Sequence, residues 1–229
     1  MRLIDLASPT PRRVSRQPEE ARYRITRRIY LPVPKRTPTI DFFRVLRRRR
    51  SRREFSLLDR SRIAPFLWYT AKTWERHLDR RGGFWEHGPA PSAGGCHPID
   101  VVLTNVPPDA HEVYLYDSLG HSLGQLALAS RAPYRRLHAL VNTLLPLGAS
   151  VVVWFVADFG RTLARYRHGE SLVWRDAGAL LATMNLVAEA LGMNCCALGA
   201  TGDPWVSRML QAGTTVRGVG GCLIGGRVG

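Results

Sequence analysis

The stretch 176-DAGALLATMNLVAEALGMNCCALGA-200 carries the clearest structural signal in the chain. Apolar residues recur at helical spacing from Leu180 to Leu191. Asp176 is favourable near a helix start, and Gly192 suits the position just past a helix end. The residues that follow, 194–200, predict a short strand. A helix that leads directly into a strand indicates a domain of mixed helices and strands.

Two earlier segments, 40–51 and 59–74, each place apolar residues on one helical face, and Asp41 lies near the start of the first helix. The predicted faces consist of Ile40, Phe43 and Leu46, then Ile63, Phe66, Leu67, Thr70 and Trp74. A further helix is predicted over Tyr134–Leu145. These helices should each present one side to the core.

Strands are predicted on both sides of the long helix: two bounded by turn residues, one from its β-branched and aromatic content, and a Gly-rich strand at the end of the sequence. They cover residues 99–106, 111–118, 149–158 and 216–229, and the first two form an antiparallel pair. Residues 82–98 are rich in Gly and Pro and predict a loop. Helices and strands do not alternate regularly, so the fold class is α+β rather than a doubly wound sheet.

The formal net charge of +15 lies entirely in residues 1–81, which hold 23 Lys and Arg against 8 Asp and Glu. Clustered cations favour a polyanionic partner, although a solvated basic surface explains them equally well. In RRRRSRREF, residues 47–55, Arg49, Ser51 and Arg53 are spaced two apart. In an extended loop they face one way and suit a phosphate. The absence of a recognisable reading motif disfavours a primary nucleic-acid function.

The length of 229 residues suits one domain, which we place at 40–229 behind a basic, proline-rich N-terminal arm at 1–39. The sequence has neither an apolar run of about 20 residues nor a signal-peptide core, so we expect a soluble, cytoplasmic protein with no membrane contact. The four cysteines lack paired spacing, which suggests buried thiols and no metal site. They are Cys96, Cys195, Cys196 and Cys222.

Five blocks in sequence order resemble the nitroreductase superfamily, specifically its SagB-type branch of FMN-dependent azoline dehydrogenases. They are RRRSRREF, PSAGGCHPIDVVL, VYLYDSLGHSL, RYRHGESLVWRDAGALLATMNLVAEALGMNCCALGA and GGCLIGGR, which together span about residues 44–227. The resemblance implies a nitroreductase-like fold, a mixed and mainly antiparallel sheet flanked by helices. It also implies a homodimer that builds its flavin site at the interface.

The resemblance also implies which residues hold FMN. Arg49, Ser51 and Arg53 match the part that binds the phosphate and ribityl groups, with Arg227 as a further phosphate ligand, and Arg47, Arg48, Arg50 and Arg52 would be solvated neighbours. Pro91, Ser92, Ala93 and Gly94 match the loop against the isoalloxazine ring, and Gly199 and Ala200 match the segment on its other side. The implied activity oxidises thiazoline or oxazoline rings to azoles in ribosomally made peptides, beside a cyclodehydratase partner.

Azoline oxidation requires a base near the ring, and the branch places a Lys-Tyr pair where this chain has Arg165 and Tyr166. Arginine cannot serve as a base at accessible pH, so Tyr166 is the better candidate. Tyr166 could instead be an interface residue, and His97 and His168 could move protons or simply pack. Trp154 and Trp174 are expected in the core or at a dimer contact. Two other functions stay open: an NAD(P)H-dependent nitro or quinone reductase, and a flavin-free scaffold for a cyclodehydratase.

Overall fold

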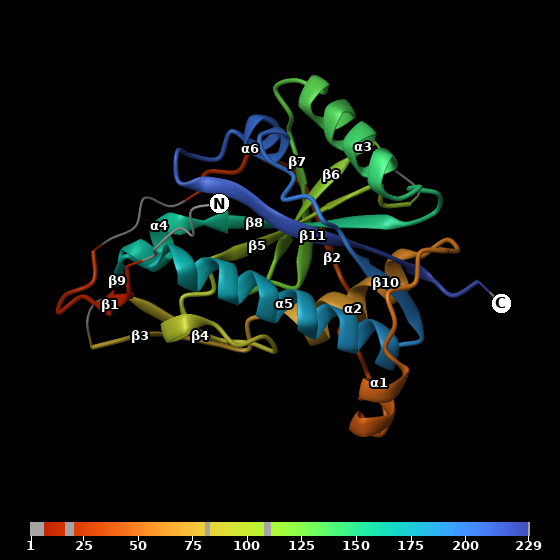
Figure 1. The fold of residues 1–229 in the computed structure, drawn as a ribbon, viewed down its shortest axis with the longest axis horizontal. Helices are drawn as coiled ribbons and strands as arrows, with labels where there is room; N and C mark the ends of the chain where they lie inside the picture. The colour runs from red at the N-terminus through yellow and green to blue at the C-terminus, as the bar shows by residue number, and fades with distance from the viewer. Residues whose placement is uncertain (1–6, 17–20, 81–82, 108–110, 229) are drawn as a thin grey trace, which may run out of the picture.

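A computed structural model describes residues 7–16, 21–80, 83–107 and 111–228. Its centre is a seven-stranded sheet whose described strand pairings are antiparallel (Figure 1). The predicted α+β class with a mainly antiparallel sheet is confirmed. In spatial order the strands are β10 (Met193–Ala197), β11 (Val216–Gly226), β8 (Val151–Asp158), β5 (Ile99–Thr104), β6 (Val113–Asp117), β7 (Ser122–Leu126) and β2 (Ile25–Tyr30).

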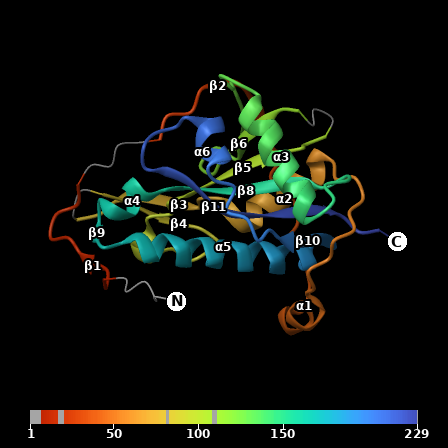
Figure 2. The same ribbon diagram turned by 45° about the horizontal axis from the view of Figure 1, so that its top comes forward.

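Helices cover both faces of this sheet (Figure 2). One face carries α2 (Arg60–Ala71) and α5 (Glu170–Ala190), and the other carries α3 (Ala132–Leu144) and α6 (Trp205–Leu210). The remaining elements are the short helices α1 (Phe42–Arg48) and α4 (Phe159–Leu163), the 3-10 turn η1 (Ala93–Gly95), and two small sheets, β1 (Thr10–Pro11) with β9 (Tyr166–Arg167) and β3 (Glu75–Leu78) with β4 (Phe84–His87).

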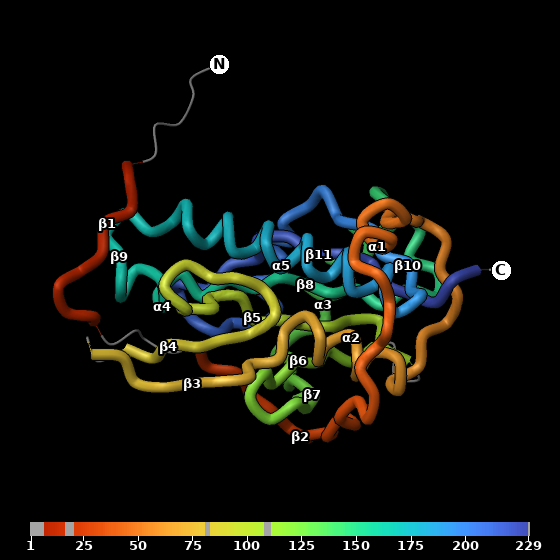
Figure 3. The backbone as a smooth tube through the Cα atoms, turned by 90° about the horizontal axis from the view of Figure 1, so that it is seen from below, coloured from red at the N-terminus to blue at the C-terminus, as the bar shows by residue number. Residues whose placement is uncertain are grey.

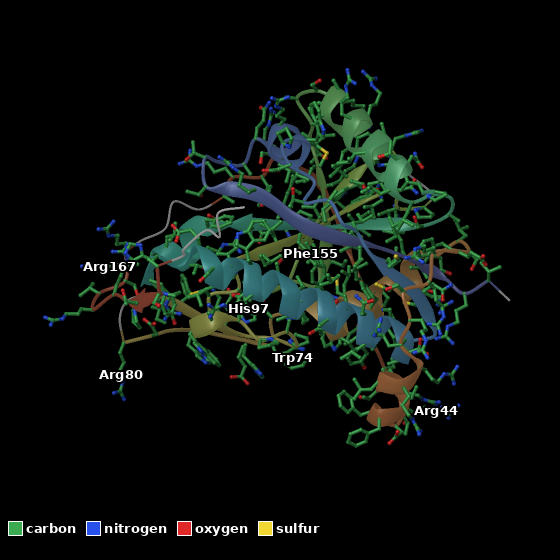
Figure 4. The ribbon with its side chains drawn as sticks, viewed as in Figure 1. Arg44, Trp74, Arg80, His97, Phe155 and Arg167 are labelled. Atoms are coloured by element: carbon green, nitrogen blue, oxygen red, sulfur yellow. The ribbon has the colours of Figure 1, made fainter. Side chains whose placement is uncertain are left out.

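The central strand β8 is buried along its whole length. Successive side chains of a strand point to opposite faces, so Val153 and Phe155 join the core under α2 and α5 while Val152 and Trp154 join the core under α3 and α6. Phe155 lies near the middle of the sheet in Figure 4. The continuous apolar run of this segment therefore reflects a strand that is covered on both faces.

The long helix α5 begins at Glu170, earlier than the predicted start at Asp176. The prediction was wrong because no Pro or Gly in 170–175 interrupts the helix. Asp176 instead lies inside the helix with its side chain buried. On the same helix Leu180 and Met184 are buried against the sheet, as their spacing predicted.

Helix α1 confirms the predicted start but not the predicted face. The Asp41 carboxylate accepts a hydrogen bond from the Arg44 backbone N–H at 2.6 Å. Phe43, however, is 70% exposed, and Ile40 and Leu46 are exposed as well. The helix projects away from the body of the molecule (Figures 1 and 2), so its apolar side contacts no described part of the sheet.

The other predicted apolar face is largely confirmed. Its members Ile63, Phe66 and Leu67 are fully buried on α2. Trp74 is the exception, because α2 ends at Ala71 and the tryptophan packs its ring against His87 of β4 at 5.5 Å. Trp74 therefore contributes to the β3–β4 hairpin rather than to the helix.

Two segments without predicted regular structure supply strands. Phe84–His87 forms β4, so the loop predicted over 82–98 was wrong at these residues; the stacking of Trp85 on His77 across the hairpin, at 5.0 Å, outweighs the neighbouring glycines. Ile25–Tyr30 of the predicted arm forms β2, whose pairing with β7 makes it an edge of the sheet.

Within the described ranges, no helix is long and apolar enough to cross a membrane.

Candidate functional site

The arginine-rich segment leaves α1 and runs along the end of the sheet. The Arg52 backbone N–H donates to the Cys195 carbonyl of β10 at 3.1 Å. Four residues later Ser56 exchanges two backbone hydrogen bonds with Gly226 of β11, at 3.0 and 2.9 Å. These two anchors fix residues 52–56 to the sheet, and we call residues 49–56 the arginine loop.

A carboxylate that the sequence analysis did not single out organises this loop. Glu189, in the last turn of α5, is 3% exposed at its side chain and lies among three guanidinium groups. The closest approaches are 2.6 Å from Arg52, 2.9 Å from Arg227 and 3.5 Å from Arg48. A carboxylate in the last turn of a helix is destabilised by the negative end of the helix dipole. The position of Glu189 in the sequence was therefore a signal that cations lie nearby.

This arrangement refines the expectation for two of the arginines. Arg48 and Arg52, expected as solvated neighbours, both pair with Glu189, although 47% and 31% of their side-chain surfaces stay exposed. Arg227 also pairs with Glu189, which places it at the same end of α5 as the arginine loop. Three guanidinium groups around one carboxylate leave an excess of positive charge at this end.

Glu189 should make the stability of the protein depend on acidity. Burial raises the pKa of its carboxyl, but hydrogen bonds from Arg52 and Arg227 outweigh burial and hold the pKa below its ordinary value near 4.5. Because the pKa is lower in the folded state, the charged carboxylate stabilises the fold when the solution pH is above the ordinary pKa. This stabilisation is lost as the pH falls through the lowered, folded-state pKa.

We therefore expect Glu189→Gln to lower the free energy of unfolding at neutral pH by about 1–3 kcal/mol. The difference from wild type should shrink toward zero as the solution is acidified, which urea unfolding at a series of pH values measures. Glu112→Gln is the control, since Glu112 pairs with Arg131 far from this cluster. A difference that stays constant across the acid range would contradict the assignment.

The candidate phosphate ligands lie on the exposed side of the arginine loop. Ser51 and Arg53 are exposed, and Arg49 is half-buried at the C-terminal cap of α1. Gly199 and Ala200 follow the end of β10, the strand to which the loop is anchored, and a Cβ added to Gly199 would meet no atom within 4 Å. Open backbone, a hydroxyl and uncompensated guanidinium charge are a donor set that fits a phosphate group.

The second group of candidates lies beside Asp176. Its carboxylate accepts hydrogen bonds from the Ser92 hydroxyl at 2.6 Å and from the Ala93 backbone N–H at 3.1 Å. The same Ser92 oxygen accepts from the His97 backbone N–H at 2.9 Å. Burial raises the pKa of Asp176 even though these hydrogen bonds favour its charged form. Residues 91–94, which we call the glycine loop, are thus held against α5.

Tyr166 and Arg165 contact this glycine loop directly. The Arg165 guanidinium donates to the Gly94 and Phe84 carbonyls and pairs with Asp79. The Tyr166 ring covers Gly94, where a Cβ would collide with the phenolic hydroxyl and lie 3.2 Å from Cζ. The structure therefore joins the predicted catalytic pair to the glycine loop. Arg165 tethers that loop and does not present a free cation.

Gly94 should be intolerant of any side chain. Its φ of +62° disfavours other residues, and an added methyl group would also displace Tyr166. We expect Gly94→Ala to lower the melting temperature, at a cost of about 1–3 kcal/mol, and to disturb the position of Tyr166. Gly148→Ala is the matched control, because Gly148 has a φ of +48° with no atom near its Cβ position. Equal effects of the two substitutions would rule out a contribution from the Tyr166 contact.

The other candidates divide between packing and surface. His97 is partly buried, with Nε2 at 3.1 Å from the Glu86 carbonyl, and burial lowers its pKa although Glu86 opposes the shift. Figure 4 shows it beside α5, near the hairpin. His168 is exposed close to Tyr166. Trp154 is fully buried, whereas Trp174 is exposed on α5. The four cysteines are free and buried, and burial raises the pKa of the Cys96 thiol to about 12.

The two groups of candidates lie toward opposite ends of α5. At a rise of about 1.5 Å per residue, Asp176 and Glu189 are separated by about 20 Å along the helix. Figure 1 shows β9 and η1 toward one end of the helix, with α1 and β10 toward the other. One copy of the chain therefore does not bring the arginine loop and the glycine loop together.

A cavity of about 640 Å³ opens beside the glycine loop and does not reach the arginine loop. Its volume is in the range of small-molecule sites. Its walls come from the β3–β4 hairpin, the glycine loop and the sheet, and include Ser92, His97, Arg165 and Asp176. The cavity thus adjoins Arg165 and the glycine loop, while Tyr166 is not among the residues that line it.

Comparison with solved structures places this architecture in a known class. A candidate nitroreductase from Ralstonia eutropha aligns at 21% identity with a TM-score of 0.64, over 97% of this chain and 100% of that chain. A second candidate nitroreductase, from Anabaena variabilis, aligns at 18% identity with a TM-score of 0.58, over 86% of this chain and 40% of that chain. A chain of the E. coli microcin synthetase McbBCD complex with truncated pro-MccB17 bound aligns at 19% identity with a TM-score of 0.57. The alignment covers 88% of this chain and 78% of that chain. At such identities the similarity establishes a nitroreductase-like fold.

The family itself follows from the sequence match. The model of the nitroreductase family matches residues 46–226, so the chain belongs to the nitroreductase family. This membership implies an FMN-dependent oxidoreductase. Comparison with curated proteins finds no match.

Proposed function

We propose that the protein is an FMN-dependent dehydrogenase that oxidises azoline rings of a peptide to azoles. The observation that carries the proposal is the contact of Tyr166 with Gly94, which puts a phenol beside the loop that resembles the isoalloxazine-binding loop of azoline dehydrogenases. The fold also occurs in the McbBCD complex, which holds a peptide. A cyclodehydratase would supply the azoline substrate.

The residues present fit FMN in two parts. Arg49, Ser51 and Arg53 would hold its phosphate, and the glycine loop would lie against its ring. When bound, FMN would accept the hydride that leaves one ring carbon of the azoline, and oxygen would later take up the electrons. Tyr166 would remove the proton from the adjacent carbon, so the substrate loses two hydrogens and gains one double bond.

The two parts are held by Asp176 and Glu189, which lie about 20 Å apart along α5, and this supports a site shared between two copies. We propose that the arginine loop of one protomer meets the glycine loop of its partner. The exposed apolar residues near these loops favour such an interface, since large apolar patches rarely face solvent without a partner. They are Ile40, Phe42, Phe43, Leu46, Leu57 and Trp174.

Mixed dimers test the shared site. Arg53→Ala weakens FMN binding and Tyr166→Phe removes the candidate base, so each variant alone should show little turnover when free FMN is kept below the dissociation constant of the Arg53→Ala variant. In mixed dimers of two-fold symmetry, one of the two sites regains both intact parts. We expect coexpression of the two variants to restore up to about a quarter of wild-type turnover. No recovery, in a preparation shown to contain mixed dimers, would place both parts in one chain.

The first test of the cofactor is the visible absorption spectrum of the purified protein, with the mass of any released chromophore. We expect FMN at close to one per chain, and then turnover of an azoline peptide in the presence of oxygen. Rapid bleaching by NADPH without azoline turnover would instead indicate the nitro or quinone reductase. A colourless protein that does not take up added FMN would leave the scaffold function.

A further inference from the structure

The N-terminal segment lies on the backbone that carries the candidate base. β1 pairs antiparallel with β9, so that Pro11 is opposite Tyr166 and Thr10 is opposite Arg167. Beyond β1, the Arg12 backbone N–H donates to the Arg165 carbonyl at 2.8 Å, and the Arg16 N–H donates to the Ala164 carbonyl at 2.9 Å. We call residues 10–16 the N-terminal strap, which runs beside β9 in Figure 3.

A side chain of the strap adds a further contact. The Arg12 Nε donates to the Leu163 carbonyl at 2.9 Å, at the end of α4. The adjacent Arg13 is exposed. Each of residues 163–165 thus has its carbonyl bound to the strap, and Tyr166 is paired with it. The strap holds a continuous stretch of backbone rather than a single point.

Such support matters because β9 has only two residues, and β1 is its described partner in that small sheet. Two-residue strands have little stability of their own. On its other side Tyr166 packs on Gly94, and Arg165 donates to the Gly94 carbonyl. The candidate base is therefore clamped between the strap and the glycine loop.

A second link joins the N-terminal segment to the glycine loop. The Tyr23 hydroxyl donates to Asp100 Oδ2 at 2.8 Å, and Asp100 forms a two-pronged ion pair with Arg161 at 2.8 and 3.0 Å. Arg161 also donates to the His97 carbonyl at 3.2 Å, just past the glycine loop. Tyr23 is thus linked through Asp100 and Arg161 to His97, whose backbone N–H donates to Ser92 of the glycine loop.

We infer that the N-terminal strap is a positioning element of the active site, which fixes the Tyr166 backbone so that its hydroxyl lies at the glycine loop. The inference rests on the proposed function, in which Tyr166 acts on the substrate. The strap lies outside residues 46–226, the part that matches the family. The segment that positions the candidate base would therefore lie outside the part of the chain that matches the family. Among the strap residues, Arg12 makes both a backbone and a side-chain contact.

The test compares two neighbouring arginines in the full-length, flavin-loaded protein. Arg12→Ala removes the bond to Leu163, while Arg13→Ala removes the same charge from an exposed site. Arg12→Pro also removes the backbone donor to Arg165, and Arg12→Lys retains a donor. We expect kcat to fall about threefold in Arg12→Ala and about tenfold in Arg12→Pro, with KM and FMN content unchanged. Arg13→Ala and Arg12→Lys should stay close to wild type.

Hydrogen exchange of residues 163–168 supplies a readout that needs no turnover. We expect faster exchange there in Arg12→Pro than in Arg13→Ala, with the exchange of α5 unchanged. Faster exchange together with wild-type kcat, or a rise in kcat, would overturn the positioning role. Equal exchange in all variants would overturn the strap contact itself. Failure of the proposed function would differ, because the unsubstituted protein would then show no azoline turnover.

Discussion

Tyr166→Phe is expected to abolish most azoline turnover, lowering kcat by about 10²- to 10⁴-fold, the usual contribution of a positioned acid or base. The substitution removes only the hydroxyl, and the ring can still cover Gly94, so the fold and the glycine loop should be retained. Steady-state turnover of an azoline peptide measures the effect.

The FMN content and melting temperature of Tyr166→Phe serve as the controls, and both should match wild type. His168→Ala is a matched variant, since His168 is exposed close by on the same segment. Wild-type kcat in Tyr166→Phe would exclude the phenol as the base. A large loss in His168→Ala alone would transfer that role to the histidine.

Arg53→Ala is expected to weaken FMN binding by about 10- to 100-fold. The estimate follows from about 1.5–3 kcal/mol for a hydrogen bond to a charged group, with about 1.4 kcal/mol for each factor of ten. A fluorescence titration of the flavin-free protein with FMN measures the dissociation constant. Arg49→Ala should act in the same direction.

Arg47→Ala is the control for this titration. Arg47 is exposed on α1 and, like Arg53, carries one positive charge, so a general electrostatic effect would change both variants alike. We expect Arg47→Ala to stay within about twofold of wild type, because the proposed phosphate site does not include Arg47 and an exposed charge acts weakly at a distance. Equal weakening in the two variants would show a diffuse basic surface instead of a specific phosphate site.

The elements predictable from the sequence were those with local signals. The buried strand β8 and the helix α3 follow from composition and spacing alone. The strands β1 and β2 could not be predicted, because each pairs with residues far along the chain and carries prolines or arginines that suggest an irregular segment. The apolar spacing of α1 predicted a helix, but spacing does not reveal what covers the face.

The candidate site was predictable in part. The residues of the glycine loop and Tyr166 were found by resemblance, and the structure brings them together. Their supports were not found: Asp176 was interpreted as a helix start, and Glu189 was not considered. Both acidic residues lie inside α5, and their partners are far away in sequence: Ser92 for Asp176 and Arg52 for Glu189. Their roles therefore depend on tertiary contacts.

The anchoring of the arginine loop has a mechanical consequence. The loop is fastened to β10 through Arg52 and to β11 through Ser56, whereas α1 projects beyond these fastenings. Arg48 and the buried Val45 also tie α1 to the end of α5, so a load on α1 from another surface would be carried into that long helix. The two backbone fastenings would meanwhile keep Arg53 in a fixed position relative to the sheet.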